Sequence, residues 1–322
     1  MLSSQMEGIY MCEFCLKQAR ALKPSKSPWG PEDEIGRLNL ITPESREKIL
    51  SSIDVTKPYD LAVDYFVGMP SWSAAGDPPY QIWMTHTPTG TIRDECMGLS
   101  QESKELISYS GDAISMYTHC GTHIDTFNHF GYRGEIWNGF NEKEHLGSRH
   151  WTKCGPEKFP AIIARAILID VAASKGVDML PDSYGIGEED LKEALYKQGT
   201  KIQEGDIVMI RTGRMNVWPD REKYLNNSPG LNIEGAEYLA GEGAMIIGGD
   251  NIALEQGPSE DPVNYFPVHT YLFSEVGIPI IEVLWLEDIA KAGIYEMGFI
   301  GTAMPLVGAT GAPIQPIAFP IK

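Results

Sequence analysis

The second half of the chain alternates strand-like and helix-like segments, and this alternation restricts the possible folds more than any other feature of the sequence. Residues 161–171 are rich in Ile and Ala and predict a buried strand, whereas Glu188–Gln198 places Leu191 and Leu195 at helical spacing and predicts a surface helix. The further predicted elements are strand 206–212, helix 233–240, strand 244–247, helix 268–276, strand 279–284, helix 286–292 and strand 299–305. Such alternation is typical of a sheet covered by helices, so the sequence predicts an α/β domain.

The first half contains clearer loop signals than strand signals. Thr42 followed by Pro43 predicts the start of a helix, with Thr42 as the N-cap and an end near Ser52. Several prolines in residues 69–80 predict a loop, and residues 85–90 are also expected to form a loop. The chain shows no internal repeat and no low-complexity segment.

The first 28 residues differ in composition from the rest of the chain. They are polar and end in a segment rich in Pro, Ser and Lys, whereas the globular pattern begins at Trp29. We therefore expect an N-terminal extension, residues 1–28, followed by a single domain, residues 29–322. The extension contains a CxxC motif formed by Cys12 and Cys15, but the sequence lacks the second cysteine pair that a zinc site of this kind needs.

The charge balance and the cysteines restrict the partners and the compartment. The chain has 26 Lys+Arg and 44 Asp+Glu, a formal net charge of −18, which argues against binding to nucleic acid or to a membrane surface. No stretch reaches the ~20 apolar residues that a membrane span needs. Five cysteines are too few, and odd in number, for a secreted disulfide framework, so we expect a cytoplasmic protein.

Three of the seven histidines fall in one short segment, His119-Cys-Gly-Thr-His123-Ile-Asp125-Thr-Phe-Asn-His129. Imidazole and carboxylate together suit a Zn, Mn or Fe ion. In an extended chain His123 and Asp125 point to the same side, but His119 would lie ~13 Å from His123. A bend at Gly121 would fold His119 back, and a glycine on the metal side would leave room for the ion. The cluster therefore predicts a metal site, with polar core residues around a turn as the alternative.

A second pair of candidate ligands lies far downstream. His269 is at the start of the predicted helix 268–276, and Glu282 lies in the predicted strand 279–284. The helix rises ~12 Å and the strand returns ~15 Å, so the two side chains can reach the same level. The neighbours of Glu282 are apolar, so its carboxylate needs a cation or a strong hydrogen-bond partner. A metal ion is one such partner, and an ordinary buried ion pair is the alternative.

The histidine-rich segment resembles the signature of the cyclase / bacterial kynurenine formamidase family of metal-dependent hydrolases, which includes isatin hydrolase. The matching positions are His119-x-Gly121-Thr122-His123-x-Asp125-x-x-x-His129. The segment that begins at Trp29 resembles the opening of the longer members, and His269 with Glu282 resembles their distal ligand pair. The resemblance covers roughly residues 29–305. Many members have Pro at the position of Phe127, and this departure favours the isatin hydrolase-like and longer branches.

This resemblance implies a fold, an assembly and a set of site residues. The implied fold is a swivelling β/β/α-type domain, in which a mixed sheet partly closed into a barrel is surrounded by helices. Members are usually homo-oligomers, so a homodimer or homotetramer is expected. The implied metal ligands are His119, His123, Asp125, His269 and Glu282. Asp125 would bridge the ions in members with two metals, and His129 is implied as the general base or proton shuttle.

These residues suit hydrolysis by a metal-activated water. A divalent ion lowers the pKa of bound water from 15.7 to about 7 and polarises the scissile carbonyl, while a histidine moves the proton. We expect Mn²⁺ or Zn²⁺, as one or two ions. Aromatic residues near the motif indicate a small cyclic or aromatic substrate. The candidate substrate-binding residues are Trp72, Trp83, Phe127 and Phe130. The expected reaction opens a C–N bond of a small cyclic, N-acyl or N-formyl amide, or a lactone C–O bond.

Two alternative functions use the same residues. His123-x-Asp125 with His269 matches the two-His-one-carboxylate triad of non-haem Fe(II) oxygenases. Oxoglutarate-dependent oxygenases normally have an Arg shortly after the distal His, however, and no Arg follows Arg221. A non-catalytic, metal-stabilised binding protein would use His129 as a ligand in a closed site, whereas a hydrolase would keep it as a base beside an open one.

Overall fold

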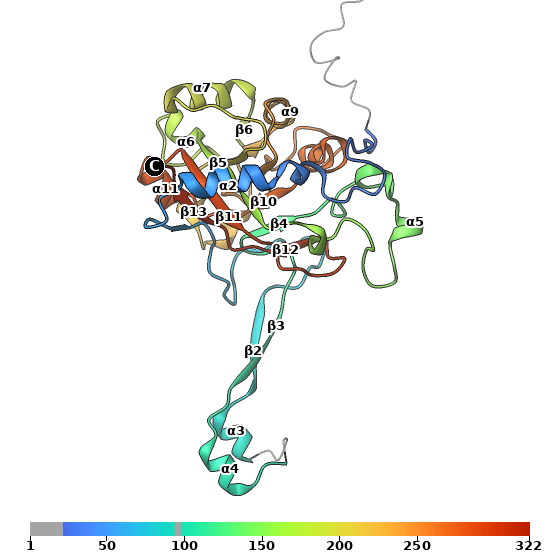
Figure 1. Cartoon of the computed structure of the whole chain (residues 1–322), viewed down its shortest axis with the longest axis vertical. Coiled ribbons are helices and arrows are strands. Elements are labelled where there is room, and N and C mark those ends of the chain that lie inside the picture. The colour runs from blue at the N-terminus through green and yellow to red at the C-terminus, as the bar shows by residue number, and fades with distance from the viewer. Residues whose placement is uncertain (1–21, 94–97) are drawn as a thin grey trace, which may run out of the picture.

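The computed structural model describes residues 22–93 and 98–322, which form a rounded body and one long projecting arm (Figure 1). Ser25 and Ser27 hydrogen-bond to the body, so the last residues of the predicted extension are attached to it. The CxxC pair of Cys12 and Cys15 lies outside the described residues. Within the described ranges, no helix is both long and apolar enough to cross a membrane.

A nine-stranded mixed sheet forms the centre of the body, in the order β1-β13-β11-β5-β7-β9-β10-β4-β12. Its strands are β1 (Tyr59–Asp60), β4 (His123–Asp125), β5 (Ile162–Asp170), β7 (Ile207–Arg211), β9 (Ile246–Gly249), β10 (Ile280–Glu282), β11 (Glu296–Gly301), β12 (Gly311–Pro313) and β13 (Ile317–Pro320). Strands β5, β7, β9 and β10 are parallel, and the strands on either side pair antiparallel. The sheet curls into a half-barrel whose edge strands β1 and β12 do not pair with each other, and the predicted fold class is confirmed.

Helices surround this sheet, and most of them are short. The α-helices of the body are α2 (Pro43–Ser52), α5 (Glu142–His145), α6 (Val171–Ser174), α7 (Glu188–Gln198), α8 (Arg221–Leu225), α9 (Ile233–Gly241), α10 (Pro267–Thr270) and α11 (Glu287–Lys291). Turns of 3₁₀-helix are η1 (Gly36–Leu40), η2 (Trp137–Gly139), η3 (Pro156–Lys158) and η4 (Arg214–Val217). The π-helix η5 (Tyr271–Val276) continues α10, so the predicted helix 268–276 changes its hydrogen-bonding pattern after one turn. Strands β6 (Gly185–Ile186) and β8 (Gly230–Leu231) pair outside the main sheet.

Strand β5 shows how the sheet is buried on both faces. Ile167 and Ile169 belong to the apolar cluster that includes side chains of α6, α7 and α9. Ala166 and Leu168 belong to a second apolar cluster with residues of the other strands and of α11. Successive strand residues point to opposite faces, and both faces are covered here. Apolar and polar side chains therefore do not alternate along residues 161–171, because neither face of the strand is exposed to solvent.

Capping and spacing signals predict α2 and α7 correctly, whereas two predicted strands are displaced. Thr42 caps α2, which has the predicted bounds, and α7 also covers the predicted residues. The predicted strand 244–247 is β9, which begins at Ile246 and ends at Gly249. Glycine at 248 leaves room for the Leu284 side chain, which fills the space that a Cβ would need. The predicted strand 299–305 is β11, which begins earlier and ends where its pairing with β5 ends, at Gly301.

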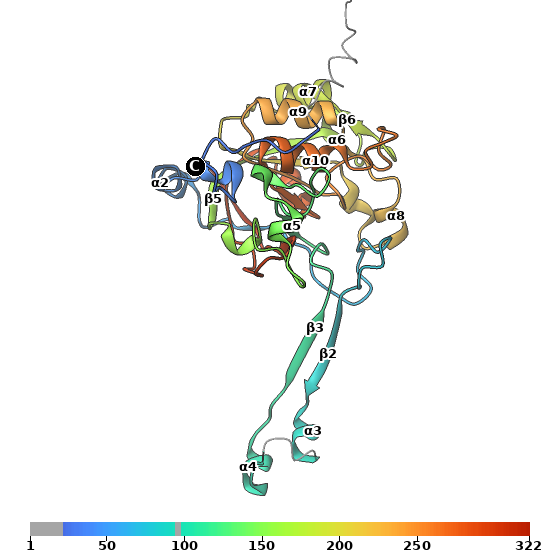
Figure 2. The same cartoon turned by 90° about the vertical axis from the view of Figure 1, so that its right-hand side faces the viewer.

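Two strands leave the body as an arm that no predicted element anticipates. Strands β2 (Gln81–His86) and β3 (Gly111–Ser115) pair antiparallel, and Figures 1 and 2 show the ribbon projecting far from the sheet. Helices α3 (Pro88–Arg93) and α4 (Gln101–Leu106) lie at its tip. The prediction of a loop at 85–90 is wrong, because its first residues belong to β2 and its last residues to α3.

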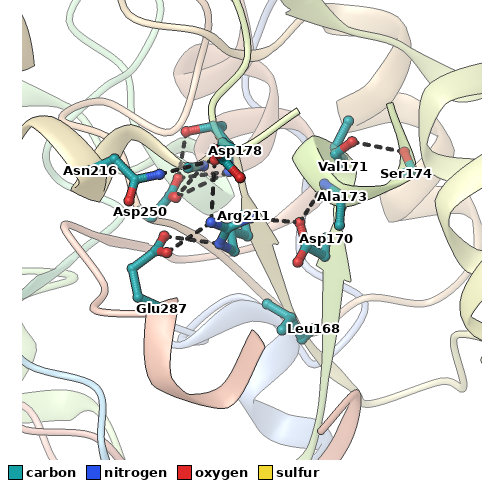
Figure 3. Close-up of polar contacts among 12 residues, drawn as sticks. Leu168, Asp170, Val171, Ala173, Ser174, Asp178, Arg211, Asn216, Asp250 and Glu287 are labelled. Atoms are coloured by element: carbon teal, nitrogen blue, oxygen red, sulfur yellow. Dashed lines mark hydrogen bonds and ion pairs between the residues drawn. The ribbon is translucent and has the colours of Figure 1, made fainter. Parts of the chain in front are cut away.

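A buried ion network lies at the carboxyl ends of the parallel strands (Figure 3). Arg211, at the end of β7, donates to Asp170 at 3.0 Å and to the two oxygens of Glu287 at 2.9 and 2.8 Å. Asp250, just after β9, accepts from the Thr212 backbone N–H at 2.9 Å and hydroxyl at 2.7 Å. Buried charges need such partners, and this network shares no residue with the histidine cluster.

Candidate metal centre

Strand β4 carries the middle of the histidine-rich segment into the sheet, between β10 and β12. His123 and Asp125 are two residues apart on this strand and therefore point to the same side. Glu282 on β10 lies directly opposite His123 in the antiparallel register, so the three side chains share one face. His123 Nε2 lies 3.2 Å from Asp125 Oδ1 and 3.4 Å from Glu282 Oε2. The sheet therefore brings Glu282, one of the two downstream candidate ligands, to the predicted ligands of the histidine-rich segment.

His119 joins the same cluster through a turn. Gly121 has a φ of +61°, and His119 Nδ1 lies 2.6 Å from Asp125 Oδ1, so the predicted bend is present. The predicted reason for the glycine, room for an ion, is wrong, because a Cβ at Gly121 would meet the ring of Tyr65 at 2.6 Å. The space beside the ligands comes from Gly311 on β12, where a Cβ would lie 2.6 Å from His119 Cε1.

His269 reaches the cluster from α10. Its Nε2 lies 3.3 Å from Glu282 Oε1 and 4.0 Å from Asp125 Oδ2. Its Nδ1 hydrogen-bonds to buried Glu255, which also accepts the His269 backbone N–H at 3.0 Å. Glu255 therefore fixes the orientation of the ring and directs Nε2 towards the cluster, as carboxylates beside metal-binding histidines do. Glu255 was not predicted, because no spacing signal in the sequence places its loop beside α10.

The side chains form two candidate ligand groups that share Asp125. One group is His119, Asp125 and His129, and the other is His123, Asp125 and Glu282. Within each group the ligand atoms lie within 4.8 Å of one another. His123 Nε2 and Glu282 Oε1 are buried and have no hydrogen-bond partner in the described part of the chain. A cation between them would satisfy both atoms, so these residues fit one or two divalent ions.

Charge interactions shift the pKa values of the histidines in opposite directions. Burial lowers the pKa of His123, but the carboxylates of Asp125 and Glu282 outweigh it and raise this pKa to about 10. Burial and the neighbouring His119 lower the pKa of His129 well below its usual 6.5. The carboxylates therefore favour a positive charge on the His123 side of the cluster, and His129 stays neutral.

His129 borders the more open side of the cluster. Its side chain is 18% exposed, whereas that of His119 is 5% exposed. It stacks on His119 with the ring centroids 3.9 Å apart, and it meets Phe130 edge-on at 4.6 Å. Phe130 also lies 4.9 Å from His269 and 5.2 Å from Phe266. Two phenylalanine rings therefore form an apolar wall beside the imidazoles.

The four predicted substrate-binding residues differ in position. Phe130 contacts the imidazoles, and Trp72 lies one ring further away, edge-on to Phe266 at 6.3 Å. Phe127 is 0% exposed in the apolar core, because the chain turns inward after β4, so its predicted contact with substrate is wrong. Trp83 lies on β2 of the arm and does not belong to the cluster, since closeness in sequence does not bring the arm back to the site.

Comparisons with known proteins place this geometry in a family. The family described as "Putative cyclase" matches residues 59–256. The kynurenine formamidase of Bacillus thuringiensis (strain Al Hakam) is 26% identical over 228 residues, which are 69% of this chain and 86% of the relative. A crystal structure described as a novel cyclase has a TM-score of 0.80 and 29% identity, covering 92% of this chain and 99% of that chain. Isatin hydrolase A from Labrenzia aggregata, bound to benzyl benzoate, has the same fold, with a TM-score of 0.60 and 17% identity over 83% of this chain and 94% of that chain.

The matched range covers more than half of the chain. It includes the whole histidine-rich segment and Glu255, while His269 and Glu282 follow it in sequence and meet it in space. The chain therefore belongs to the cyclase family and is a hydrolase of the amide-cleaving type.

Proposed function

We propose that this protein is a metal-dependent hydrolase that opens a C–N bond in a small cyclic amide, or in an N-acyl or N-formyl amide. A lactone C–O bond is the related alternative. The observation that carries this proposal is the buried carboxylate of Asp125, which belongs to two groups of ligand atoms at once. The relatives named kynurenine formamidase and isatin hydrolase support the substrate class.

We propose Mn²⁺ or Zn²⁺ as the cofactor. Histidine nitrogens and carboxylate oxygens are ligands that both metals accept. His119 and Asp125 would hold one ion, and His123 and Glu282 would hold a second ion that shares Asp125. When bound, a divalent ion supplies a water of low pKa and polarises the scissile carbonyl. The shared position of Asp125 supports two ions rather than one.

We propose His129 as the general base and proton carrier. Its Nε2 lies 3.8 Å from Asp125 Oδ2, close to the ligands, and its ring is the most exposed of the cluster. A neutral imidazole in this position takes a proton from the attacking water and delivers it to the leaving nitrogen. The burial of the other imidazoles supports their role as ligands.

The aromatic wall supports a flat substrate. Phe130 and Phe266 pack beside the imidazoles, and Trp72 extends the wall by one ring. Offset or edge-on contacts with such rings favour a planar cyclic or aromatic group. We propose that the ring of the substrate packs on this wall, so that its carbonyl faces the ligand groups.

The two alternative functions fit the geometry less well. An oxygenase triad of His123, Asp125 and His269 needs one carboxylate, whereas Glu282 brings a second carboxylate to the same point. A structural metal site is fully ligated and closed, whereas the exposure of His129 leaves one side of this cluster open. Membership of the cyclase family also favours the hydrolase.

We further propose a cytoplasmic location and a homo-oligomeric state. Cys120 and Cys154 are buried and carry free thiols, which suits a reducing compartment. Burial raises the pKa of Cys120 to about 11, which keeps this thiol protonated and unreactive beside the metal ligands.

The test of this function combines metal content with turnover. The metal-depleted protein is reloaded with Mn²⁺ or Zn²⁺ and assayed on N-formyl, cyclic-imide and lactone substrates. We expect His129→Ala to retain metal and to lose roughly 10²–10⁴-fold in turnover, whereas the exposed His150→Ala serves as the unaffected control. Loss of metal together with activity in His129→Ala would assign His129 to the ligands instead. Absence of hydrolysis in every metal-loaded form would contradict the proposed function.

A further inference from the structure

We propose that Thr310 is a positioning residue of the metal centre, whose hydroxyl holds His119 so that Nδ1 of this ring, and not Nε2, faces the ion. Thr310 lies directly before β12 and far in sequence from the histidine-rich segment. The inference rests on the proposed metal cofactor, but it does not depend on which bond the protein hydrolyses.

Two of the histidines direct Nε2 towards the carboxylates of the cluster. His123 Nδ1 lies 2.9 Å from the Gly121 carbonyl oxygen, which can only accept a hydrogen bond, so this Nδ1 carries a proton. His269 Nδ1 hydrogen-bonds to Glu255. The Nε2 atoms of the two rings lie 3.4 and 3.3 Å from the carboxylate oxygens of Glu282. A neutral imidazole has only one N–H, so each of these rings keeps Nε2 free for an ion.

His119 has the opposite orientation. Its Nδ1 lies 2.6 Å from Asp125 Oδ1, and its Nε2 lies 2.8 Å from the hydroxyl oxygen of Thr310. Asp125 belongs to both candidate ligand groups, so the nitrogen beside it is the one that an ion in the cluster can reach. An ion takes the lone pair of that nitrogen, and the single proton of a neutral imidazole then lies on the other nitrogen. In His119 the other nitrogen is Nε2, and Thr310 Oγ1 accepts its proton in a hydrogen bond.

The burial of His119 makes this hydrogen bond important. The side chain is 5% exposed, so little of the ring is open to water that could replace a lost acceptor. A buried N–H group without an acceptor is unfavourable, because it has lost its hydrogen bonds to water and gained none in the protein. Removal of the Thr310 hydroxyl would therefore disfavour the form of His119 that binds an ion through Nδ1.

Close packing restricts rotation of the His119 ring. A Cβ at Gly311 would lie 2.6 Å from its Cε1 and 2.9 Å from its Nδ1, so the backbone of β12 lies directly against this edge of the ring. The ring of His129 stacks on it with the centroids 3.9 Å apart, and the ring of Tyr117 lies 4.8 Å away. The two nitrogens of His119 therefore keep their separate partners, Asp125 for Nδ1 and Thr310 for Nε2.

Backbone hydrogen bonds fix the position of Thr310 itself. Its carbonyl accepts a hydrogen bond from the Thr126 backbone N–H at 3.0 Å, directly after β4. The next residue, Gly311, lies opposite Asp125 in the antiparallel register of β12 and β4. The strand that carries the predicted ligands therefore also holds the segment that carries the hydroxyl, so the two cannot move far apart without breaking the sheet.

The experiment measures the binding of Zn²⁺ alone to the purified full-length protein, by competition with a chromophoric chelator. Thr310→Val keeps nearly the same shape of side chain and removes the hydroxyl, whereas Thr310→Ser keeps the hydroxyl. Thr302→Val makes the same change at an exposed residue of the C-terminal part of the chain and is the matched control. We expect Thr310→Val to raise the Kd of a bound Zn²⁺ by roughly 10-fold to 100-fold. Thr310→Ser and the control should retain the affinity of the unmodified chain.

A crystal structure of the unmodified protein loaded with Zn²⁺ provides a second measurement that needs no variant. We expect His119 Nδ1 to lie ~2.0–2.1 Å from the ion and Nε2 to keep its hydrogen bond to Thr310. Thermal unfolding of the metal-free proteins checks that the variants are folded.

Four results would overturn the inference. Equal affinity of Thr310→Val and the unmodified chain would show that the hydroxyl does not position the ring, and an ion on His119 Nε2 would show that the other nitrogen is the ligand. Loss of affinity in Thr310→Ser as well would assign Thr310 a packing role. Absence of zinc binding in the unmodified chain would contradict the proposed cofactor too. A chain that shows the expected zinc binding but hydrolyses no amide would support this inference and contradict only the proposed reaction.

Discussion

At the scale of single residues, the burial of a charge is tolerated only where donors or opposite charges surround it. Asp250 is fully buried and accepts hydrogen bonds from the Thr212 hydroxyl at 2.7 Å and from the Gly213 backbone N–H at 2.8 Å. Burial outweighs these hydrogen bonds and raises the pKa of Asp250 from 3.8 to about 6. This carboxylate therefore differs from Asp125, which lies among histidines that hold its pKa well below the usual value.

The raised pKa of Asp250 predicts a dependence of stability on pH. The folded protein binds a proton at Asp250 more tightly than the unfolded chain, so the stabilising contribution is complete below about pH 4 and is lost as the pH rises through about 6. Asp250→Asn lacks this titration. We expect the free energy of unfolding of the unmodified protein, minus that of Asp250→Asn, to fall by on the order of 2–3 kcal/mol between pH 4 and pH 7. Urea unfolding of both proteins at pH 4 and pH 7 measures this difference in the free energy of unfolding. A difference that stays the same at the two pH values would contradict the pKa shift.

At the scale of elements, the sequence predicts what local chemistry decides. The N-cap at Thr42 and the leucine spacing of α7 depend on neighbouring residues in the chain, and both helices have the predicted bounds. Strands β2 and β3 pair with each other away from the body, and neither alternation nor loop signals predicted this arm. Glu255 reaches the site only because its loop folds against α10. Phe266 directly precedes α10 and Phe127 lies between Asp125 and His129, but no local signal in the sequence shows that the first ring faces His269 and the second turns into the core.

The turn at Gly121 supports a prediction at this scale. Gly121→Ala forces an alanine into the left-handed region and pushes the Tyr65 ring, whose hydroxyl donates to the Thr122 carbonyl at 2.6 Å. Gly176→Ala is the matched control, because Gly176 has a φ of +71° and open space around it. The control should lose about 1–2 kcal/mol of stability, from the backbone strain alone. Gly121→Ala should lose about 1–3 kcal/mol more than the control, because the Tyr65 ring must move. We also expect Gly121→Ala to bind less metal.

Urea unfolding and elemental analysis of the two glycine variants provide the comparison. Equal stability losses, with metal content unchanged in both, would show that the contact with Tyr65 does not shape the site. A metal loss confined to Gly121→Ala would show that this turn positions His119 relative to Asp125.

At the scale of the whole molecule, the metal centre joins segments that are far apart in the sequence. His123 and Asp125 lie on β4 in the first half of the chain, whereas His269 on α10 and Glu282 on β10 belong to the second half. The sheet already pairs β4 with β10, but the buried ligand atoms His123 Nε2 and Glu282 Oε1 have no hydrogen-bond partner among residues 22–93 and 98–322. A bound ion would therefore stabilise the contact between the two halves.

Removal of the metal should lower the thermal stability of the whole protein. A ligand that binds only the folded state at about 100 times its Kd adds about 2.7 kcal/mol, which corresponds to a rise in Tm of roughly 5 °C for a chain of this size. We expect Mn²⁺ or Zn²⁺ to produce this rise in the metal-depleted protein and in the control Asp261→Asn, which changes an exposed loop. Asp125→Asn should show little or no rise, because Asp125 belongs to both ligand groups. Scanning calorimetry measures the shift, and an equal rise in Asp125→Asn would place the stabilising ion elsewhere in the molecule.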